Sequence, residues 1–296
     1  AIKHHMITVD AMKKSSDTDH IPLKWVGMEK IVMPVRHSIA GETTNLIAEF
    51  DIFVNLVNPS KGIHMSRLYE LLIQYTQQES ISLVGIRKIL KNFVSSQNGL
   101  STSAKISMSL VVPVSVKTLK SEKQYFKSVP LQFSFVLKPE GVNTEMKFKL
   151  DYSSTCPQSA ALAHQLTIAE LEKQSMLSAA ELTAWYTQRG FVATPHAQRS
   201  ELALSLMVKD EFELKDFTAL YLGIEQALGT PTQGIVKRAD EQEFARLNAA
   251  NLMFCEDAAR KILVFLKQTP DLRSGQGKVS HLESLHSHNA TAFFEF

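Results

Sequence analysis

Long alternations of apolar and polar residues are the feature that most restricts how this chain can fold. In residues 44–58 every second side chain is apolar, from Leu46 to Leu56. A period of two places these side chains on one face of a β-strand. The alternation returns in residues 106–116 and 129–137, and a further run ends near Tyr152. Strands of this length with one apolar face predict antiparallel sheets that other elements cover on that face.

Two amphipathic helices are predicted between the second strand and the third. Apolar residues recur there at the i, i+3, i+4, i+7 spacing of a helix that buries one face. Ser66 is a suitable N-cap for the first helix, and Gly99 a suitable end for the second. Pro113, in the strand that follows, predicts an edge position because proline has no N–H to donate. The two apolar stripes are Leu68, Leu71, Leu72 and Tyr75, and Ile86, Ile89, Leu90, Phe93 and Val94.

The second half of the chain repeats this order more loosely. We expect a strand from Leu202 to Val208, a helix from Phe217 to Leu228, and one or two helices in residues 241–268. A final strand pair would close the chain, with "SLHSHNATAFFEF" as its last member. The pattern predicts an α+β fold with an internal duplication, divided into residues 23–155 and 156–296.

Residues 159–195 interrupt the repeat and are predicted to be an inserted helical hairpin. Thr167 with Glu170, and Ser178 with Glu181, have the spacing of capping boxes. Gly190 is a natural end for the second helix. The insertion must therefore loop outward if the residues on either side of it are to meet.

Composition excludes several classes of protein. The net charge is only +2, so no nucleic-acid or membrane partner is expected. No apolar run approaches the ~20 residues of a membrane helix, and residues 1–22 are predicted to be a flexible leader. The two cysteines favour a reducing cytoplasm. Cys255 has the helical spacing of a core residue, whereas Cys156 lies at a strand end, where reactive groups are often held.

Basic residues gather where a predicted strand gives way to a predicted helix. In "NPSKGIHMSRL", the side chains of Lys61, His64 and Arg67 lie at a helix N-terminus, where the backbone N–H groups and the dipole favour an anion. The alternative is a solvated basic loop. We expect a phosphate-bearing ligand, to which later parts of the chain also contribute. The later candidates are Arg199, Ser200, Lys237 and Arg238.

Side chains of the kinds that bind Zn²⁺, Mn²⁺ or Fe²⁺ recur in the second half. A strand at "SLHSHNA" would place His286 and His288 on one face, as two ligands or as a ligand and a proton donor. The alternative is a solvated strand entry. Glu256 has the chemistry to accept two hydrogen bonds from an edge such as that of guanine. The candidate ligands are Cys156, His196, Glu241, Glu283, His286 and His288.

Taken together, these motifs resemble one known family. The segments "SKGIHMSRL", "CP-S", "H-QRS", "KR-DE", "F-ED" and "ESLHSH" occur in the order seen in the prokaryotic type IB GTP cyclohydrolases, also called the GTP cyclohydrolase IV family. The likeness covers roughly residues 22–296. The combination of "KGIHMSR" with "ESLHSHNA" is far more specific than either segment alone.

The resemblance implies a fold, an assembly and a reaction. The two halves would be tunnelling-fold modules, and the chain a homotetramer with active sites at subunit interfaces. The enzyme would convert GTP and water to 7,8-dihydroneopterin triphosphate and formate, the first step of folate and pterin biosynthesis. It would need a divalent metal, Mn²⁺ or Zn²⁺, with Fe²⁺ as a further candidate.

The resemblance also implies roles for individual residues. Glu256 would anchor the purine. Without a matching family role, we also infer that the cations named above hold the triphosphate, with His64 and Ser200 as further substrate-binding candidates. Proton transfer would fall to His196, His286 or His288, with Cys156 as a ligand that moves on and off the metal. The implied metal ligands are Cys156, His196, Glu241, Glu283 and His286.

The chain departs from the family pattern at several points. Gln158 stands where a second cysteine is usual, Ala239 where proline is common, and Asn289 where aspartate is common. The insertion separates Cys156 from His196, where the family has a short turn. These departures leave open a catalytically inactive protein that binds a purine or pterin. A further alternative, the nitrile reductase of queuosine synthesis, shares the fold, but its motif is not found here.

Overall fold

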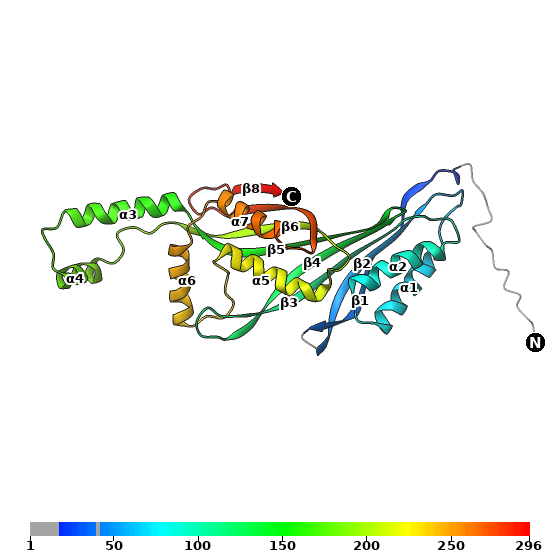
Figure 1. The fold of residues 1–296 in the computed structure, drawn as a ribbon, viewed down its shortest axis with the longest axis horizontal. Coiled ribbons are helices and arrows are strands. Elements are labelled where there is room, and N and C mark those ends of the chain that lie inside the picture. The colour runs from blue at the N-terminus through cyan, green and yellow to red at the C-terminus, as the bar shows by residue number, and fades with distance from the viewer. Residues whose placement is uncertain (1–17, 40–41) are drawn as a thin grey trace, which may run out of the picture. The chain divides into compact units, whose positions relative to one another are not determined.

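The computed structural model describes residues 18–39 and 42–296, and it confirms the predicted α+β class (Figure 1). Eight strands form one sheet in the order in which they occur in the chain. The strands are β1 (Leu23–Ile39), β2 (Glu42–Leu56), β3 (Ala104–Lys117), β4 (Gln124–Lys138), β5 (Gly141–Thr155), β6 (Ala197–Val208), β7 (Leu272–His281) and β8 (Ala290–Glu295). The α-helices are α1 (Met65–Gln78), α2 (Leu83–Ser96), α3 (Pro157–Glu172), α4 (Ala179–Arg189), α5 (Phe217–Leu228), α6 (Arg238–Ala250) and α7 (Cys255–Lys267).

The described residues group into two compact units, both of which draw on the long strands β3 to β6. The first contains the residues up to Val112, with Pro130–Met146 and Met207–Lys215. The second contains Pro113–Val129, Lys147–Leu206 and Asp216–Phe296. The division of the chain into modules at residues 155 and 156 stays a prediction. Most of the predicted leader, residues 1–17, lies outside the described residues.

The first unit buries the helical stripes against the alternating strands, as predicted. Leu68 and Leu72 of α1 and Phe93 of α2 are fully buried, as are Phe50 and Ile52 of β2. The start of α1 differs from the prediction, because the helix begins at Met65 and Ser66 lies inside it. Its N-cap is His64, whose backbone N–H donates to Gln97 Oε1 at 2.7 Å. A side chain distant in the sequence therefore satisfies a backbone N–H at the helix N-terminus.

The second unit is built around α5 and α7, which pack on each other, and α7 also contacts β7 and β8. Phe148 of β5 meets Phe217 of α5 edge to face, with ring centroids 5.0 Å apart. Cys255 is buried on α7 with Ala259 and Ile262, as its helical spacing predicts. None of the helices in the described part of the chain is long and apolar enough to span a membrane.

The predicted insertion is confirmed as two helices, α3 and α4. Ser178 and Glu181 form the predicted capping box of α4, and Gly190 ends that helix with a φ of 66°. The first predicted capping box is wrong, because α3 already begins at Pro157 and Thr167 lies in its middle. There the Thr167 hydroxyl donates to Ala163 O, four residues back.

Two predictions about strands are also wrong. Pro113 is not on an edge strand, since β3 lies between β2 and β4. β3 pairs with β2 over Ala104–Leu110, and Pro113 lies beyond these rungs, where its missing N–H does not interrupt the ladder. The last strand begins at Ala290, and the segment with His286 and His288 is a loop between β7 and β8.

Candidate active site

The two ends of the helical insertion meet at Cys156 and His196. Cys156 follows the last residue of β5 and is the N-cap of α3. Its backbone N–H donates to His196 O at 3.3 Å, and the His196 N–H donates to Ser159 Oγ at 3.1 Å. The expectation that Cys156 and His196 converge across the insertion is therefore confirmed.

Glu283 comes to the same place from the far end of the chain. Its Oε2 atom lies 3.9 Å from His196 Nδ1, and the two side chains are 14% and 18% exposed. The loop is held there because the Leu282 N–H donates to Arg199 O at 3.1 Å. Glu283 Oε2 is buried and has no hydrogen-bond partner among the described residues. A buried carboxylate oxygen in this state calls for a cation or a donor from a ligand.

A buried polar network extends from His196 into the interior of the unit. His196 Nδ1 lies 2.9 Å from Gln198 Oε1, and Gln198 Nε2 donates to Ser154 Oγ at 2.7 Å. Ser154 Oγ is also 3.3 Å from His281 Nδ1, whose ring partner Nε2 is 2.9 Å from the Tyr152 hydroxyl. Sequence analysis missed this network. The available signal was the two-residue spacing of His196 and Gln198, at the point where β6 begins.

Burial sets the protonation of the inner end of this network. Desolvation lowers the pKa of His281 to about 4, although Glu283 works in the opposite direction. Desolvation also raises the pKa of Tyr152 well above its usual range. At neutral pH, therefore, His281 is neutral and Tyr152 keeps its proton.

A cavity of about 540 Å³ opens beside this network and has a volume suited to a small ligand. Arg199 and Glu241, both predicted site residues, line it together with Gln198, Phe244 and Asn248. Asn248 Oδ1 accepts a hydrogen bond from Ser153 Oγ at 2.6 Å, which ties α6 to β5. The cavity therefore lies where β5, β6 and α6 meet.

Asp240 fixes the start of α6 and hence the position of Glu241. Its carboxylate accepts hydrogen bonds from the backbone N–H groups of Lys120, Ser121 and Lys237 at 2.8 Å each. The Ser121 hydroxyl adds a fourth, and together they hold the pKa of Asp240 far below its usual range. In the motif "KRADE" the aspartate is thus structural, and the neighbouring glutamate faces the cavity.

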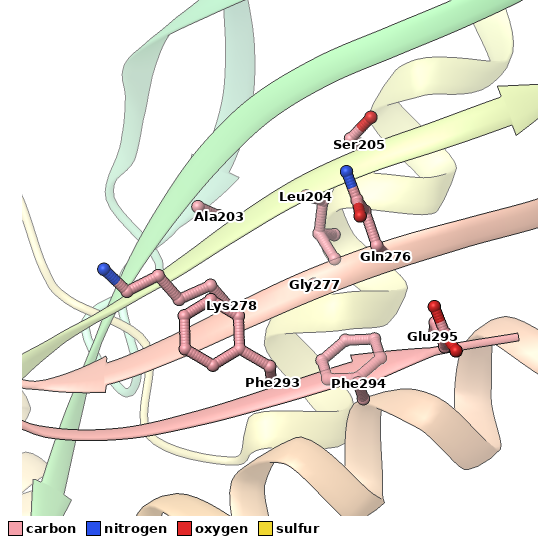
Figure 2. A pocket seen from close by; sticks show the side chains of 9 residues that line it. All are labelled: Ala203, Leu204, Ser205, Gln276, Gly277, Lys278, Phe293, Phe294 and Glu295. Atoms are coloured by element: carbon pink, nitrogen blue, oxygen red, sulfur yellow. The ribbon is translucent and has the colours of Figure 1, made fainter.

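Another cavity, of about 530 Å³, lies on β6, β7 and β8 (Figure 2). Gln276 and Lys278 of β7 are paired with Glu295 and Phe293 of β8. The Lys278 ammonium lies 5.7 Å from the centroid of the Phe293 ring, which is 75% exposed. None of the predicted site residues lines this cavity.

The other residues predicted for the second unit lie on its surface or in its core. His286 and His288 are exposed on the loop that also carries Glu283, and their rings stack with centroids 4.9 Å apart. Glu256 is exposed in the first turn of α7, where hydrogen bonds from its own N–H and from the Cys255 thiol lower its pKa. Lys237 and Arg238 are exposed. Ser200 is fully buried, 2.8 Å from Ser154 Oγ.

The basic group predicted near α1 belongs to the first unit. Lys61 is exposed, and Arg67 donates through Nη1 to Ser96 O at the end of α2. His64 is bound on both sides by Gln97, which accepts from His64 N and donates to His64 O at 3.3 Å. A helix entry with two cations is therefore present as predicted, and its ligand stays a prediction.

The donor types at Cys156, His196 and Glu283 fit a divalent metal. Thiolate, imidazole and carboxylate are the ligands that Zn²⁺ uses. Glu283 Oε2 has no competing hydrogen bond, as described above. Across residues 18–39 and 42–296, however, no three His, Cys, Asp or Glu side chains already stand in a metal-binding group. Side-chain rotation would therefore accompany metal binding.

Comparison with known proteins identifies a family. A family profile described as type I GTP cyclohydrolase folE2 matches residues 9–292. A GTP cyclohydrolase FolE2 of Pseudoalteromonas atlantica is 41% identical over 92% of this chain and 90% of its own length. One of Pseudoalteromonas translucida is 42% identical, over 91% of both chains. One of Citrobacter koseri is 39% identical, over 96% and 95%.

Among solved structures, the fold resembles that of uricases. A hyper-thermostable uricase mutant superposes with a TM-score of 0.53 over 92% of this chain and 91% of its own, at 6% identity. Uricase from Arthrobacter globiformis gives 0.51 over 93% and 92%, at 7% identity. At such identities the likeness concerns the fold alone, and it confirms the predicted tunnelling fold.

Proposed function

Because the chain belongs to the type I GTP cyclohydrolase FolE2 family, we infer that it is a GTP cyclohydrolase of folate biosynthesis. In this reaction water opens the imidazole ring of GTP and releases C8 as formate. The ribose carbons then rearrange and close a new ring, which gives 7,8-dihydroneopterin triphosphate. The observation that supports a site here is the backbone hydrogen bond between Cys156 and His196, together with Glu283 Oε2 at 3.9 Å from His196 Nδ1.

The residues of the second unit have the chemistry to hold GTP. Glu256, kept ionised by its hydrogen bonds, would accept from the ring N–H and the exocyclic amino group of guanine. Arg199, Lys237 and Arg238 would neutralise the triphosphate. Phosphate binding by Lys61 and Arg67 of the first unit stays a separate prediction. Holding both ends of the substrate fixes the purine C8 atom at the site.

Other residues of the second unit would bind the metal and donate the proton. Cys156, His196 and Glu283 would hold a divalent metal, Mn²⁺ or Zn²⁺, with Glu241 and His286 as the remaining predicted ligands. When bound, such an ion lowers the pKa of water so that hydroxide is available near neutral pH. His286 or His288, exposed on the loop that bears Glu283, would donate the proton that the purine N7 or N9 needs as the ring opens.

The test is turnover of GTP by metal-free protein reconstituted with Mn²⁺, Zn²⁺ or Fe²⁺ in separate samples. We expect formate and 7,8-dihydroneopterin triphosphate in equal amounts, and loss of both in Cys156→Ser. The absence of product with all three metals would contradict the assignment. Tight GTP binding without ring opening would instead support the inactive binder, which the glutamine at position 158 favours.

We also propose that the protein is a cytoplasmic homotetramer with active sites at subunit interfaces. The two cysteines of the chain are both free, which suits a reducing compartment. The insertion offers a surface for assembly, because Leu162, Leu166 and Ile168 of α3 are 51%, 54% and 43% exposed. Light scattering on the purified protein measures the mass. A monomer at working concentration would contradict the proposed assembly.

A further inference from the structure

We propose that Gln198 is a positioning residue that fixes the tautomer of His196, with the proton on Nδ1 and the lone pair on Nε2. The buried polar network of Tyr152, His281, Ser154 and Gln198 sets the direction of the glutamine amide. Only the role of His196 Nε2 in metal binding or proton transfer rests on the proposed function. The tautomer itself is a property of the protein without metal or substrate.

The first step is the two-sided bonding of the Gln198 amide. The side chain is 8% exposed, so both ends must find protein partners. Its Oε1 atom lies 2.9 Å from His196 Nδ1, and its Nε2 atom donates to Ser154 Oγ at 2.7 Å. An amide oxygen only accepts, so the proton between Oε1 and the imidazole belongs to His196 Nδ1.

The second step concerns the network that prevents the Gln198 amide from flipping, which would exchange its Oε1 and Nε2 atoms. Tyr152 keeps its proton and can donate it to His281 Nε2 at 2.9 Å. Because Nε2 accepts this bond, a proton of the His281 ring lies on Nδ1, which faces Ser154 Oγ at 3.3 Å. Ser154 Oγ lies 2.8 Å from Ser200 Oγ, and when Ser154 gives its one proton to that bond, it has only lone pairs to offer Gln198.

The tautomer determines which nitrogen of His196 has a free lone pair. Glu283 Oε2, at 3.9 Å from Nδ1, is too distant to take that proton, so Gln198 is its acceptor. With Nδ1 protonated, Nε2 is the basic nitrogen and is free to bind a metal or to transfer a proton. Partners of this kind orient metal-binding histidines, and their loss costs about 10–100-fold in metal affinity.

Two substitutions at position 198 separate this role from a merely structural one. Gln198→Met keeps the length of the side chain but removes the acceptor. Gln198→Glu keeps an acceptor for His196 Nδ1–H, and like the methionine it cannot donate to Ser154. We expect Zn²⁺ affinity, measured by competition with a chromophoric chelator, to fall about 10–100-fold in Gln198→Met. In Gln198→Glu it should stay within about threefold of wild type.

A matched control comes from the same unit. Gln124 Nε2 also donates to a serine hydroxyl, that of Ser115 at 2.7 Å, but it lies outside the network. Gln124→Met should leave Zn²⁺ affinity unchanged. Equal losses in the methionine and glutamate variants at position 198 would mean that the bond to Ser154 matters for packing alone, and would overturn the proposal.

The second readout needs neither metal nor turnover. Metal-free protein labelled with ¹⁵N-histidine reports the protonated ring nitrogen of each imidazole by long-range ¹H–¹⁵N correlation, with His196→Asn used to assign the signal. We expect the Nδ1–H form for wild type and Gln198→Glu, and a mixture for Ser154→Ala. An Nε2–H form in wild type would overturn the proposal even if the Gln198 variants fail to fold. Failure to turn over GTP would leave this result intact and would count against the proposed function alone.

Discussion

The ion pair between Lys127 of β4 and Glu225 of α5 is a sensitive point of the second unit. The two side chains are 13% and 8% exposed, and the Lys127 ammonium is hydrogen-bonded to Glu225 Oε1. Burial raises the pKa of Glu225, and the lysine opposes that shift. Lys127→Met removes the cation and leaves a carboxylate in the interior. We expect the free energy of unfolding to fall by about 3–5 kcal/mol at neutral pH.

The pH dependence of the loss has a definite sign. The folded-state pKa of Glu225 lies above its unfolded value, so its contribution to stability is present at low pH and is lost as the pH rises through the folded pKa. Removing Lys127 raises the folded pKa further. The deficit of Lys127→Met, measured by urea denaturation, should therefore shrink when the pH is lowered from about 7 to about 5, as the carboxyl group takes up a proton.

An exposed pair in the same unit provides the control. Lys149 and Glu201 form an ion pair at 3.0 Å, with side chains 64% and 33% exposed. Lys149→Met should cost at most about 1 kcal/mol, since water screens such pairs. Equal destabilisation by the two lysine substitutions, or a loss in Lys127→Met that is the same at both pH values, would refute the reasoning.

Three further predictions concern the cysteines, the insertion and the site. Iodoacetamide at about pH 8 should modify Cys156, which is partly exposed, and spare Cys255, because burial raises the pKa of the Cys255 thiol to about 11. Peptide mass spectrometry measures the labelling of both cysteines, and equal labelling would contradict this prediction. Ser178→Ala should cost α4 about 1 kcal/mol of local stability, seen as faster amide hydrogen exchange in that helix only, and unchanged exchange would show that the capping box contributes nothing. Glu283→Gln should weaken Mn²⁺ binding at least about tenfold, and unaltered binding would remove Glu283 from the site.

Periodicity predicts the elements of this fold well because burial enforces it. The side chains at alternate positions of β3, from Ile106 to Val116, are all buried, as the alternation requires. The errors arise where long-range contacts decide. α1 begins at Met65 because Gln97, at the far end of α2, binds the backbone of His64. No pattern around Ser66 reveals that contact.

The candidate site could be assembled from the sequence only in part. The predicted meeting of Cys156, His196 and Glu283 depends on motifs whose order resembles that of a family. The structure joins the backbones of Cys156 and His196 and places Glu283 Oε2 3.9 Å from the His196 ring, while their grouping around a metal stays a prediction. The partners that hold His196 were not predicted, because Tyr152 and His281 look like ordinary strand residues. Their role depends on a register between strands that lie far apart in the chain, and such a register is not visible in either strand alone.

The location of the metal tests the central claim most directly. An anomalous difference map from a crystal grown with Mn²⁺ or Zn²⁺ would show where the ion binds. We expect one strong peak within ligand distance of the Cys156 thiolate, the His196 ring and the Glu283 carboxylate. A peak elsewhere, with those three side chains left without an ion, would contradict it.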